Sequence, residues 1–347
     1  MKRTYIIAEM AYSHDGSQDL AKTIVHDAAD AGADAISIHL THMPSYMVKH
    51  YKTEPGRVSE GELTKSIYEY IDDITIPFEK WDAVVSDVRE KNLDLLIMPN
   101  DLASLEYADK LKPDAYVLSA ACFEEYDFIG QVGKKGLPVY LRVGGATIGE
   151  IESVVNILFE QGNTDITLLY GHQNYPTTIE DTNIYFLSYL KKIFGLPVGM
   201  ADHVDADDDF SLDAPLLALP LGISCIEKHI THDRSKKGED FESALNKDEF
   251  ELLVKKVRKA ELALNDKGLL EFTKSNVFYR QNVRKRVVAA TDINARETIT
   301  KDKLACKRSD EGVFPSQMDA LIGLTALKKI NKDQGIDLSL FKQEGNN

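Results

Sequence analysis

Two histidines, each near the end of a short apolar run, are the residues of this sequence that point most directly to chemistry. His203 lies in the run GMADHV and His229 in the run CIEKHI. Both runs read as strands, and because side chains alternate along a strand, Cys225, Glu227 and His229 share one face. Two neutral imidazoles with oxygen ligands nearby suit a divalent first-row metal. The spacing alone also allows a second interpretation, in which both are ordinary polar residues at strand ends.

Several carboxylates accompany the two histidines along the chain. Asp202 directly precedes His203, Glu227 lies two residues before His229, and Asp240 follows in the segment SKKGED. If both strands end at the same rim, two imidazoles and several carboxylates converge there. We therefore expect a polar site at the carboxyl ends of these strands.

The elements that must position these residues are eight short apolar runs that alternate with helix-like segments. In the first unit a strand is followed by a polar turn and an amphipathic segment that stops at Gly32, a residue type that commonly ends helices. Strict alternation implies a parallel sheet, and eight units in about 260 residues favour a closed (β/α)8 TIM barrel over an open sheet. The expected strands are Thr4–Met10, Ala35–Leu40, Leu93–Pro99, Ala115–Ala120, Pro138–Val143, Ile166–Gly171, Gly199–Val204 and Cys225–Ile230.

In such a barrel the active site lies at the carboxyl ends of the strands. A long segment from Thr41 to Pro77 interrupts the alternation, and a loop of this length between a strand and a helix is usually functional. No GxGxxG motif follows the first strand, which argues against a dinucleotide-binding fold. The residues expected at the strand ends are Glu9, His39, Asn100, Arg142, Tyr175, His203 and His229.

Length and charge restrict the possible classes of protein. The 347 residues fit one barrel of roughly 250 residues plus a small module. A hydrophobic fraction of 43% and a charged fraction of 28% are typical of a soluble protein with a sizeable core. The formal net charge of −15 argues against a nucleic-acid or anionic-membrane partner. An anionic substrate would therefore need a local basic pocket or a metal.

The cysteines and the apolar runs indicate the compartment. Cys122, Cys225 and Cys306 are widely spaced and form no CxxC pair, so neither a disulfide framework nor a zinc ribbon is expected. The short apolar run at the start is interrupted by Glu9 and does not read as a signal peptide. No run approaches the roughly 18 apolar residues of a membrane span. We expect a soluble, cytoplasmic protein.

The pattern of apolar and polar residues changes in the last quarter of the sequence. We expect the barrel domain in residues 1–268, a linker with little apolar periodicity in 269–283, and a second domain in 284–347. The last segment has β-branched runs separated by turns, which predicts a small β-rich fold. A module of about 60 residues is marginally stable alone and would gain by docking.

Several strings together resemble the sialic acid synthase family, whose members make N-acetylneuraminate, legionaminate and pseudaminate from phosphoenolpyruvate and an N-acyl sugar. The string VVAATDINARETITKDKLACKR, followed by LIG, resembles the antifreeze-like SAF domain of the same enzymes. The resemblance covers nearly the whole chain. Its strings in the barrel are AEM and SHDGS between Ala8 and Ser17, AGADA at Ala31–Ala35, YPTTIED at Tyr175–Asp181, GLPVGMADH at Gly195–His203, and IEKHIT with DRSKKGED at Ile226–Asp240.

By position, this resemblance implies the roles of the polar residues. It implies that His203 and His229 bind manganese, which polarises the carbonyl of an open-chain sugar while C3 of phosphoenolpyruvate attacks it. Glu9 matches a carboxylate that handles the water or proton in the step that loses phosphate. Glu227 and Asp240 match carboxylates that bind the sugar near the metal.

Other matches concern substrate binding and assembly. Gln173 and Tyr175 match positions that line the substrate pocket. Arg308 matches a SAF-domain arginine that reaches across a domain-swapped homodimer into the partner's barrel and contacts the acyl group of the sugar. Judged without the resemblance, Arg308 would be read as a solvated loop charge.

The chain departs from the family where phosphate is bound. Ser37 and His39 stand where the family has a KxQ pattern in the second strand, and Val117 and Ala120 replace the lysine and serine of a KIGS pattern. A hydrogen bond to a charged group is worth roughly 1.5–3 kcal/mol, so these losses would weaken phosphoenolpyruvate binding by powers of ten.

Three further positions differ in the same region. Arg142 and Ala201 correspond to serines that contact phosphate, and Asn100 corresponds to a threonine. Arg142 could restore part of the phosphate site with a bidentate fork. Alternatively, Arg142 pairs with a neighbouring carboxylate at the barrel rim.

The leading interpretation is a metal-dependent nonulosonic acid synthase that condenses phosphoenolpyruvate with an N-acyl hexosamine or a related sugar. A second interpretation keeps metal-assisted carbon–carbon bond formation but uses another donor, such as pyruvate. A third is a non-catalytic sugar-binding barrel that partners an active synthase. Retention of the whole set of polar residues argues against the third, and these are Glu9, His203, Glu227, His229 and Asp240.

Overall fold

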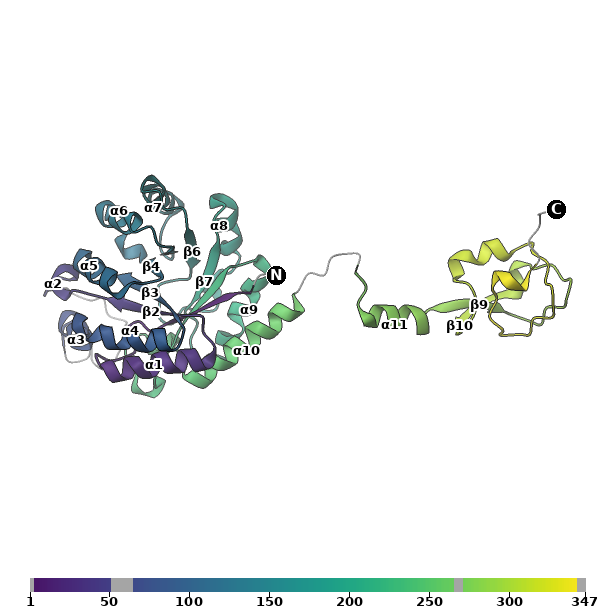
Figure 1. The fold of residues 1–347 in the computed structure, drawn as a ribbon, viewed down its shortest axis with the longest axis horizontal. Helices are drawn as coiled ribbons and strands as arrows, with labels where there is room; N and C mark the ends of the chain where they lie inside the picture. The colour runs from purple at the N-terminus through teal and green to yellow at the C-terminus, as the bar shows by residue number, and fades with distance from the viewer. Residues whose placement is uncertain (1–2, 51–64, 265–270, 342–347) are drawn as a thin grey trace. The chain divides into compact units, whose positions relative to one another are not determined.

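The computed structural model describes residues 3–50, 65–264 and 271–341. The chain forms two compact units, Met1–Asn265 and Asp266–Asn347 (Figure 1). Each unit has a hydrophobic core of its own.

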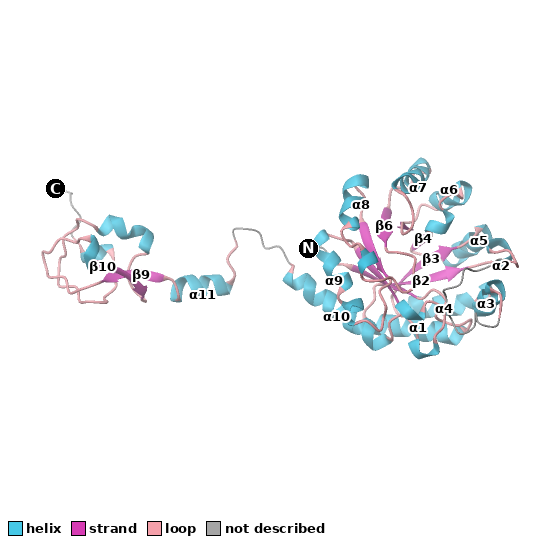
Figure 2. Ribbon diagram, turned by 180° about the vertical axis from the view of Figure 1, so that it is seen from behind, coloured by secondary structure: helices cyan, strands magenta, loops and turns pink. Residues whose placement is uncertain are grey.

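The first unit is a closed barrel of eight parallel strands, in which each strand pairs with the next and the last pairs with the first. Figure 2 shows strands of this unit, in magenta, with helices, in cyan, around them. This confirms the predicted (β/α)8 TIM barrel. The strands follow the apolar runs closely because a parallel strand is covered on both faces and needs apolar residues on both. Their bounds are β1 Tyr5–Glu9, β2 Ala35–Leu40, β3 Asp94–Pro99, β4 Ala115–Leu118, β5 Val139–Arg142, β6 Ile166–Tyr170, β7 Val198–Asp202 and β8 Cys225–His229.

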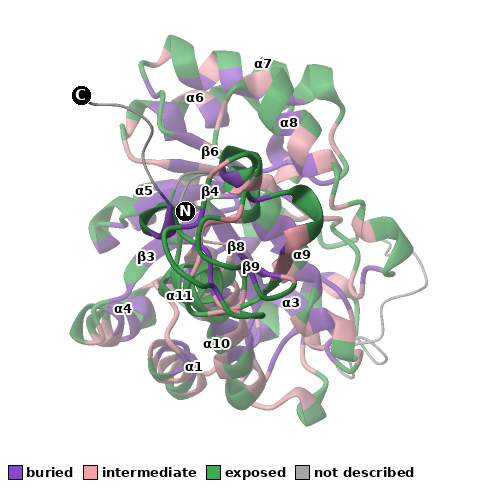
Figure 3. Ribbon diagram, turned by 90° about the vertical axis from the view of Figure 1, so that its right-hand side faces the viewer, coloured by how far each residue is buried: buried purple, intermediate pink, exposed green. Residues whose placement is uncertain are grey.

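Helices surround the barrel, and their capping residues set their ends. The first helix begins after Ser17, whose side chain accepts a hydrogen bond from the backbone of Leu20, and ends at Gly32 in the left-handed conformation. The strands are largely buried and the outward faces of the helices are exposed (Figure 3). No described helix is long and apolar enough to cross a membrane. The helices of this unit are α1 Gln18–Ala31, α2 Met43–Tyr46, α3 Ile67–Ile74, α4 Trp81–Glu90, α5 Leu102–Leu111, α6 Tyr126–Lys134, α7 Ile148–Glu160, α8 Phe186–Phe194, α9 Ala214–Ala218 and α10 Lys247–Ala263.

Alternate strand residues point into the barrel and fill it in layers. The register places Glu9 beside His229 and Ala201 beside Glu227. His203 lies two residues beyond Ala201 and therefore points to the same inner face. The polar residues thus continue the row of inward-facing side chains at its carboxyl end. The deeper side chains are apolar, and they include Ile7, Ala35, Leu96, Met98, Val117, Leu169 and Cys225.

The long segment predicted after the second strand carries two short helices, α2 and α3. Helix α3 begins at a capping box in which Ser66 and Glu69 satisfy each other's backbone groups. Residues 51–64 of this segment lie outside the described residues. The two helices share a small apolar cluster, which contains Met43, Tyr68, Tyr70, Ile71 and Ile74.

The second unit contains helix α11 (Lys274–Asn282) and an antiparallel pair of strands, β9 (Lys285–Ala289) and β10 (Leu304–Arg308). Its small sheet matches the expected β-rich domain. Most of the described part of residues 269–283, where the sequence predicts a linker with little apolar periodicity, is helical. A capping box at Thr273 starts α11. None of its side chains is buried, so apolar periodicity could not have revealed it.

Candidate active site

Five charged or titratable side chains meet inside the carboxyl end of the barrel. They come from β1, β5 and β8 and from the residue that follows β7, and each is 2% exposed or less. The set consists of Glu9, Arg142, His203, Glu227 and His229. The sequence analysis had placed four of them at strand ends and Glu227 on the same strand face as His229, and barrel closure brings all five together.

Arg142 lies between two carboxylates. One of its terminal nitrogens, Nη2, is paired with Glu9 Oε2 and lies 3.0 Å from Glu227 Oε1. The other, Nη1, lies 3.6 Å from the sulfur of Met98. Of the two roles left open by the sequence, the structure shows the pairing with neighbouring carboxylates. These two negative charges raise the pKa of Arg142 although burial acts to lower it.

Glu9 is held by several donors. Its Oε1 accepts a hydrogen bond from the backbone N–H of Ala11 at 2.8 Å and lies 3.2 Å from His39 Nε2. Burial acts to raise the pKa of Glu9, but the charges of Arg142 and His39 outweigh burial and hold this pKa well below its usual range. The contact with His39 was not predicted. The sequence shows only that His39 and Ser37 share a strand face, whereas the register that pairs Ser37 with Glu9 is set when β1 and β2 come together.

Glu227 is less constrained than Glu9. Neither of its carboxylate oxygens makes a hydrogen bond within the described residues, although Oε1 is at ion-pair distance from Arg142. Burial raises the pKa of Glu227 to about 7, against the opposing charge of Arg142. The two carboxylates that flank Arg142 therefore differ in environment, as commonly occurs at catalytic sites.

His203 and His229 lie side by side, with ring centroids 5.2 Å apart. His203 Nδ1 donates to the backbone carbonyl of His172 at 2.6 Å, which leaves the lone pair on Nε2. His203 Nε2 and both ring nitrogens of His229 have no hydrogen-bond partner within the described part of the chain. Burial lowers the pKa of His203 to about 3 and holds the pKa of His229 well below its usual range.

These features fit a pair of metal ligands. A histidine ligand is neutral and usually donates its second nitrogen to an oxygen acceptor, as His203 does to His172. Across residues 3–50, 65–264 and 271–341, no group of three or more His, Cys, Asp or Glu side chains is arranged to hold an ion.

Tyr175 covers the histidine pair. Its ring centroid lies 4.6 Å from that of His203 and 5.3 Å from that of His229. The Tyr175 hydroxyl donates to Gln173 Oε1 at 3.0 Å. Both residues belong to the loop after β6, and His172, which holds His203, lies in the same loop. The structure thus brings the predicted pocket residues Gln173 and Tyr175 to the site.

Asn100 lies on the opposite side of the mouth, in a chain of hydrogen bonds. Its Nδ2 donates to Thr41 Oγ1 at 2.8 Å, and this oxygen lies 2.6 Å from the Tyr12 hydroxyl. The Tyr12 ring packs edge-on against His39, with centroids 5.5 Å apart. Thr41 and Phe78 also line an open pocket of ≈ 310 Å³.

Two of the residues predicted to belong to the site follow the histidine pair in the sequence. Asp240 starts the short 3-10 turn Phe241–Ser243 in the loop after β8. Its charge contributes to raising the pKa of Tyr12, which burial raises most. Arg308 is exposed at the end of β10 in the second unit.

The expectation that Asp202 joins the rim of the site is wrong. Lys228 Nζ donates to Asp202 Oδ2 at 2.6 Å and to the carbonyl of Val204 at 3.2 Å, and the Lys228 side chain is fully buried. Asp202 and Lys228 are register partners, and alternation turns both away from the barrel interior. They form a structural ion pair between barrel and helices.

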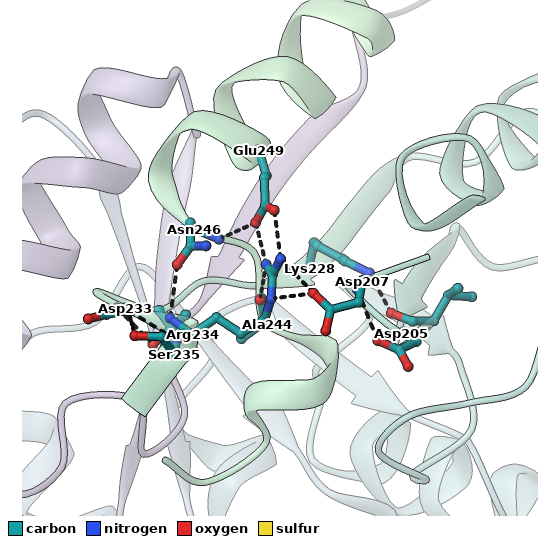
Figure 4. A network of polar contacts seen from close by, with 11 residues as sticks. Asp205, Asp207, Lys228, Asp233, Arg234, Ser235, Ala244, Asn246 and Glu249 are labelled. Atoms are coloured by element: carbon teal, nitrogen blue, oxygen red, sulfur yellow. Dashed lines mark hydrogen bonds and ion pairs between the residues drawn. The ribbon is translucent and has the colours of Figure 1, made fainter. Parts of the chain in front are cut away.

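Arg234 fixes the loop that follows β8. It donates to Glu249 Oε1 at 2.7 Å, to Asp207 Oδ1 at 3.0 Å and to the carbonyl of Ala244 at 3.3 Å (Figure 4). These bonds tie the loop to the start of α10 and to the loop after β7. Asp240 lies between Arg234 and Ala244 in sequence, so its loop is anchored at both ends.

A closed barrel with imidazoles, carboxylates and a guanidinium gathered at the carboxyl ends of its strands has the architecture of a TIM-barrel enzyme. Residues 24–268 match the NeuB family, and residues 284–342 match the SAF domain. The chain belongs to the NeuB family, and it is an enzyme. The resemblance drawn from the sequence is thereby confirmed.

Similar proteins span nearly the whole chain. A pseudaminic acid synthase of Campylobacter jejuni is 30% identical over 346 residues, which are 98% of this chain and 97% of that protein. An N,N'-diacetyllegionaminic acid synthase of the same species is 27% identical over 336 residues, 96% of this chain and 99% of that protein.

Solved structures share the fold. The N-acetylneuraminic acid synthetase of Leptospira borgpetersenii has a TM-score of 0.67 at 24% identity, covering 81% of this chain and 93% of that chain. The spore coat polysaccharide biosynthesis protein SpsE of Bacillus subtilis has a TM-score of 0.63 at 24% identity, covering 99% and 96%.

Proposed function

We propose that this chain is a metal-dependent nonulosonic acid synthase, which joins a three-carbon donor to an N-acyl hexosamine or a related sugar. The observation that carries the proposal is the neutral pair His203 and His229 beneath Tyr175. The relatives named as pseudaminic and legionaminic acid synthases support this class of product.

His203 and His229 would hold a divalent cation, with Mn²⁺ as the ion that the sequence resemblance implies. Their pairing, their neutral state and the unpartnered nitrogens support this assignment. A cation bound there would act as a Lewis acid on the carbonyl of the acceptor sugar. Because the protein supplies two ligands, positions remain open for that carbonyl and for water.

The loops around the mouth would bind and orient the acceptor. Tyr175 and Gln173 form one wall above the histidines. Asn100 and the pocket beside Thr41 form another, and its ≈ 310 Å³ falls at the lower end of the range of small-molecule sites. Asp240 would bind sugar hydroxyls from the loop after β8. We assign acid–base roles to Glu9 and Glu227, which flank Arg142.

The sequence resemblance also implies how the chain assembles and which donor it uses, and we propose both. The first is a domain-swapped homodimer in which Arg308 contacts the acyl group of a sugar bound in the partner's barrel. The exposure of Arg308 and the match to a SAF domain support it. The second is the donor, for which the sequence resemblance implies phosphoenolpyruvate.

The test is formation of a nine-carbon 2-oxo acid by the manganese-loaded protein, detected by mass spectrometry. N-acetylmannosamine and two diacetamido sugars serve as acceptors, each with phosphoenolpyruvate and with pyruvate. We expect product in at least one combination. His203→Ala is expected to abolish product, whereas His26→Ala, a partly exposed histidine on α1, is expected to leave it unchanged. No product from a metal-loaded protein with any pair would favour the non-catalytic sugar-binding alternative.

A further inference from the structure

His39 lies over the buried carboxylate of Glu9, on the side of the barrel mouth. The register pairs Glu9 with Ser37. His39 is two residues further along β2, so it points to the same inner face one layer nearer the carboxyl end. Its Nε2 lies 3.2 Å from Glu9 Oε1, and its side chain is 10% exposed whereas that of Glu9 is fully buried. Because Nε2 itself is buried, the exposed part of the ring is the part that faces away from Glu9.

The two oxygens of Glu9 have different partners. A carboxylate offers about four acceptor positions, two on each oxygen. Oε1 accepts the backbone N–H of Ala11 at 2.8 Å, and His39 Nε2 is near enough to take the second position on this oxygen. Oε2 is paired with Arg142 Nη2, which takes one of its two positions. With His39 in place, the acceptor position left open within the described residues is on Oε2.

The contact between His39 and Glu9 is close but not fully aligned. The two atoms are within ion-pair distance, although their geometry is not that of a complete hydrogen bond. Contacts of this kind at catalytic sites often tighten only when substrate is bound. At 3.2 Å a reorientation of the imidazole lets Nε2–H donate to Oε1 without movement of the strands.

The His39 ring is braced from the mouth of the barrel. The Tyr12 ring packs edge-on against it, with centroids 5.5 Å apart and the ring planes at 88°. The Tyr12 hydroxyl lies 2.6 Å from Thr41 Oγ1, which also accepts a hydrogen bond from Asn100 Nδ2 at 2.8 Å. Packing and hydrogen bonds around a functional side chain restrict its rotamers. The brace therefore keeps the Nε2 edge of His39 toward Glu9.

We propose that His39 is a positioning residue, which takes the second acceptor position of Glu9 Oε1 and so leaves Oε2, beside Arg142, to exchange a proton with the reactants. The inference rests on the proposed function, because it refines the acid–base role of Glu9 in that same site. When Glu9 acts as a base, an O–H bond of water or of a substrate hydroxyl breaks. Its electron pair stays on that oxygen and the proton bonds to Oε2. The reverse step returns the proton, and nothing is oxidised or reduced.

Two substitutions separate the hydrogen bond from the imidazole that makes it. His39→Leu removes the donor and is expected to lower kcat about ten- to a hundredfold, the range that loss of a hydrogen bond to a charged group produces. Manganese affinity and KM for both substrates should stay close to the wild-type values, and retained manganese binding shows that the variant is folded. The amide of glutamine can donate but cannot carry a proton, so His39→Gln should regain most of the lost kcat.

His26 provides the matched control. Its Nε2 also lies 3.2 Å from a carboxylate oxygen, Asp87 Oδ2, but its side chain is 44% exposed. His26→Leu is expected to keep the wild-type kcat. All variants are assayed as manganese-loaded full-length protein, with the donor and acceptor that the wild type turns over fastest.

An NMR measurement tests the contact without turnover. The full-length protein is labelled with ¹⁵N-histidine and kept free of paramagnetic Mn²⁺, and the His39 signals are those absent from the spectrum of His39→Gln. We expect the tautomer of His39 that carries its proton on Nε2. This proton should exchange slowly with water, because Nε2 is buried.

Each outcome decides the proposal. A kcat of His39→Gln as low as that of His39→Leu would overturn the positioning role, because the imidazole itself would then be required. An unchanged kcat in His39→Leu would overturn it too, as would a His39 tautomer protonated on Nδ1, since Nε2 could not donate. Failure of the proposed function looks different. The wild type would then form no sugar acid from any donor and acceptor, while the tautomer of His39 would still decide whether it can hold Oε1.

Discussion

At the scale of single residues, Arg142 sets the balance of charge in the site. It is the buried cation between Glu9 and Glu227, and both carboxylates depend on it for compensation. Glu9 has additional donors and Glu227 has none that is hydrogen-bonded within the described residues. One guanidinium thus supports two carboxylates with different chemical tasks.

Replacing Arg142 with methionine is expected to destabilise the barrel strongly. The change leaves two buried carboxylates without a cation, and breaking a buried pair in this way costs about 3–5 kcal/mol. Urea unfolding measures the loss. The matched control is Arg89→Met, because Arg89 pairs with Asp114 at the surface with 40% and 42% of their side chains exposed. Its cost should stay below about 1 kcal/mol. Equal losses in the two variants would contradict the structural role of Arg142.

His14 is expected to make the barrel sensitive to acid. Burial, followed by the charges of His39 and His232, lowers its pKa to about 3. Since this value lies below the pKa of an unfolded histidine, the stabilisation is present above pH ~6.5 and is lost as the pH falls toward 3. His14 Nδ1 accepts from the backbone of Gly16 at 3.1 Å, and asparagine can keep this acceptor.

His14→Asn is therefore expected to flatten the pH dependence. Between pH ~6.5 and ~5 the unfolding free energy of the wild type should fall more steeply, by up to about 1.4 kcal/mol per pH unit. Urea titrations at several pH values measure both slopes. Parallel slopes would show that His14 does not titrate on unfolding.

At the scale of elements, close backbone packing positions the loops after β5, β6 and β7. A Cβ atom on Gly171 would overlap the carbonyl oxygen of Ala201, and one on Gly144 would overlap that of Gly171. These contacts fix the start of the loop that carries His172, Gln173 and Tyr175. The position of His203 thus depends on a glycine in a neighbouring strand unit.

Gly171→Ala is expected to destabilise the barrel by at least about 2 kcal/mol, because the backbone of β7 must move. It should also weaken metal binding, since the loop shift moves the carbonyl of His172 away from His203. The control is Gly149→Ala in the first turn of α7, where a Cβ meets no atom within 4 Å. That change should be neutral or slightly stabilising. Unaltered stability and metal affinity in Gly171→Ala would contradict this account.

Sequence patterns reveal the elements better than the contacts between them. The eight strands could be predicted because each is a continuous apolar run, and the inward direction of His203, Glu227 and His229 followed from alternation. The partners of Arg142 could not be chosen, because β1, β5 and β8 meet only when the barrel closes. Helix α11 was missed because it buries no side chain.

At the scale of the whole molecule, the open question is how a second unit would contribute to a site in a barrel. Arg308 lies in the second unit and the histidine pair in the first. If Arg308 acts across a homodimer, each complete site needs two chains.

A mixing experiment tests this arrangement. His203→Ala and Arg308→Ala are each expected to have little synthase activity alone, the first for lack of metal and the second for weak sugar binding. After mixing and subunit exchange, half of the dimers are mixed, and each has one complete site, so about a quarter of wild-type activity should return. Activity that stays at the level of the separate variants would exclude a contribution of Arg308 across the dimer.

The central claim is that His203 and His229 hold the divalent ion of this enzyme. The most direct measurement is manganese binding, followed by the electron paramagnetic resonance signal of free Mn²⁺. We expect one ion per chain in the wild type and in His26→Ala, and affinity reduced at least about a hundredfold in His203→Ala and in His229→Ala. Manganese bound with wild-type affinity by either of these two folded variants would contradict the account.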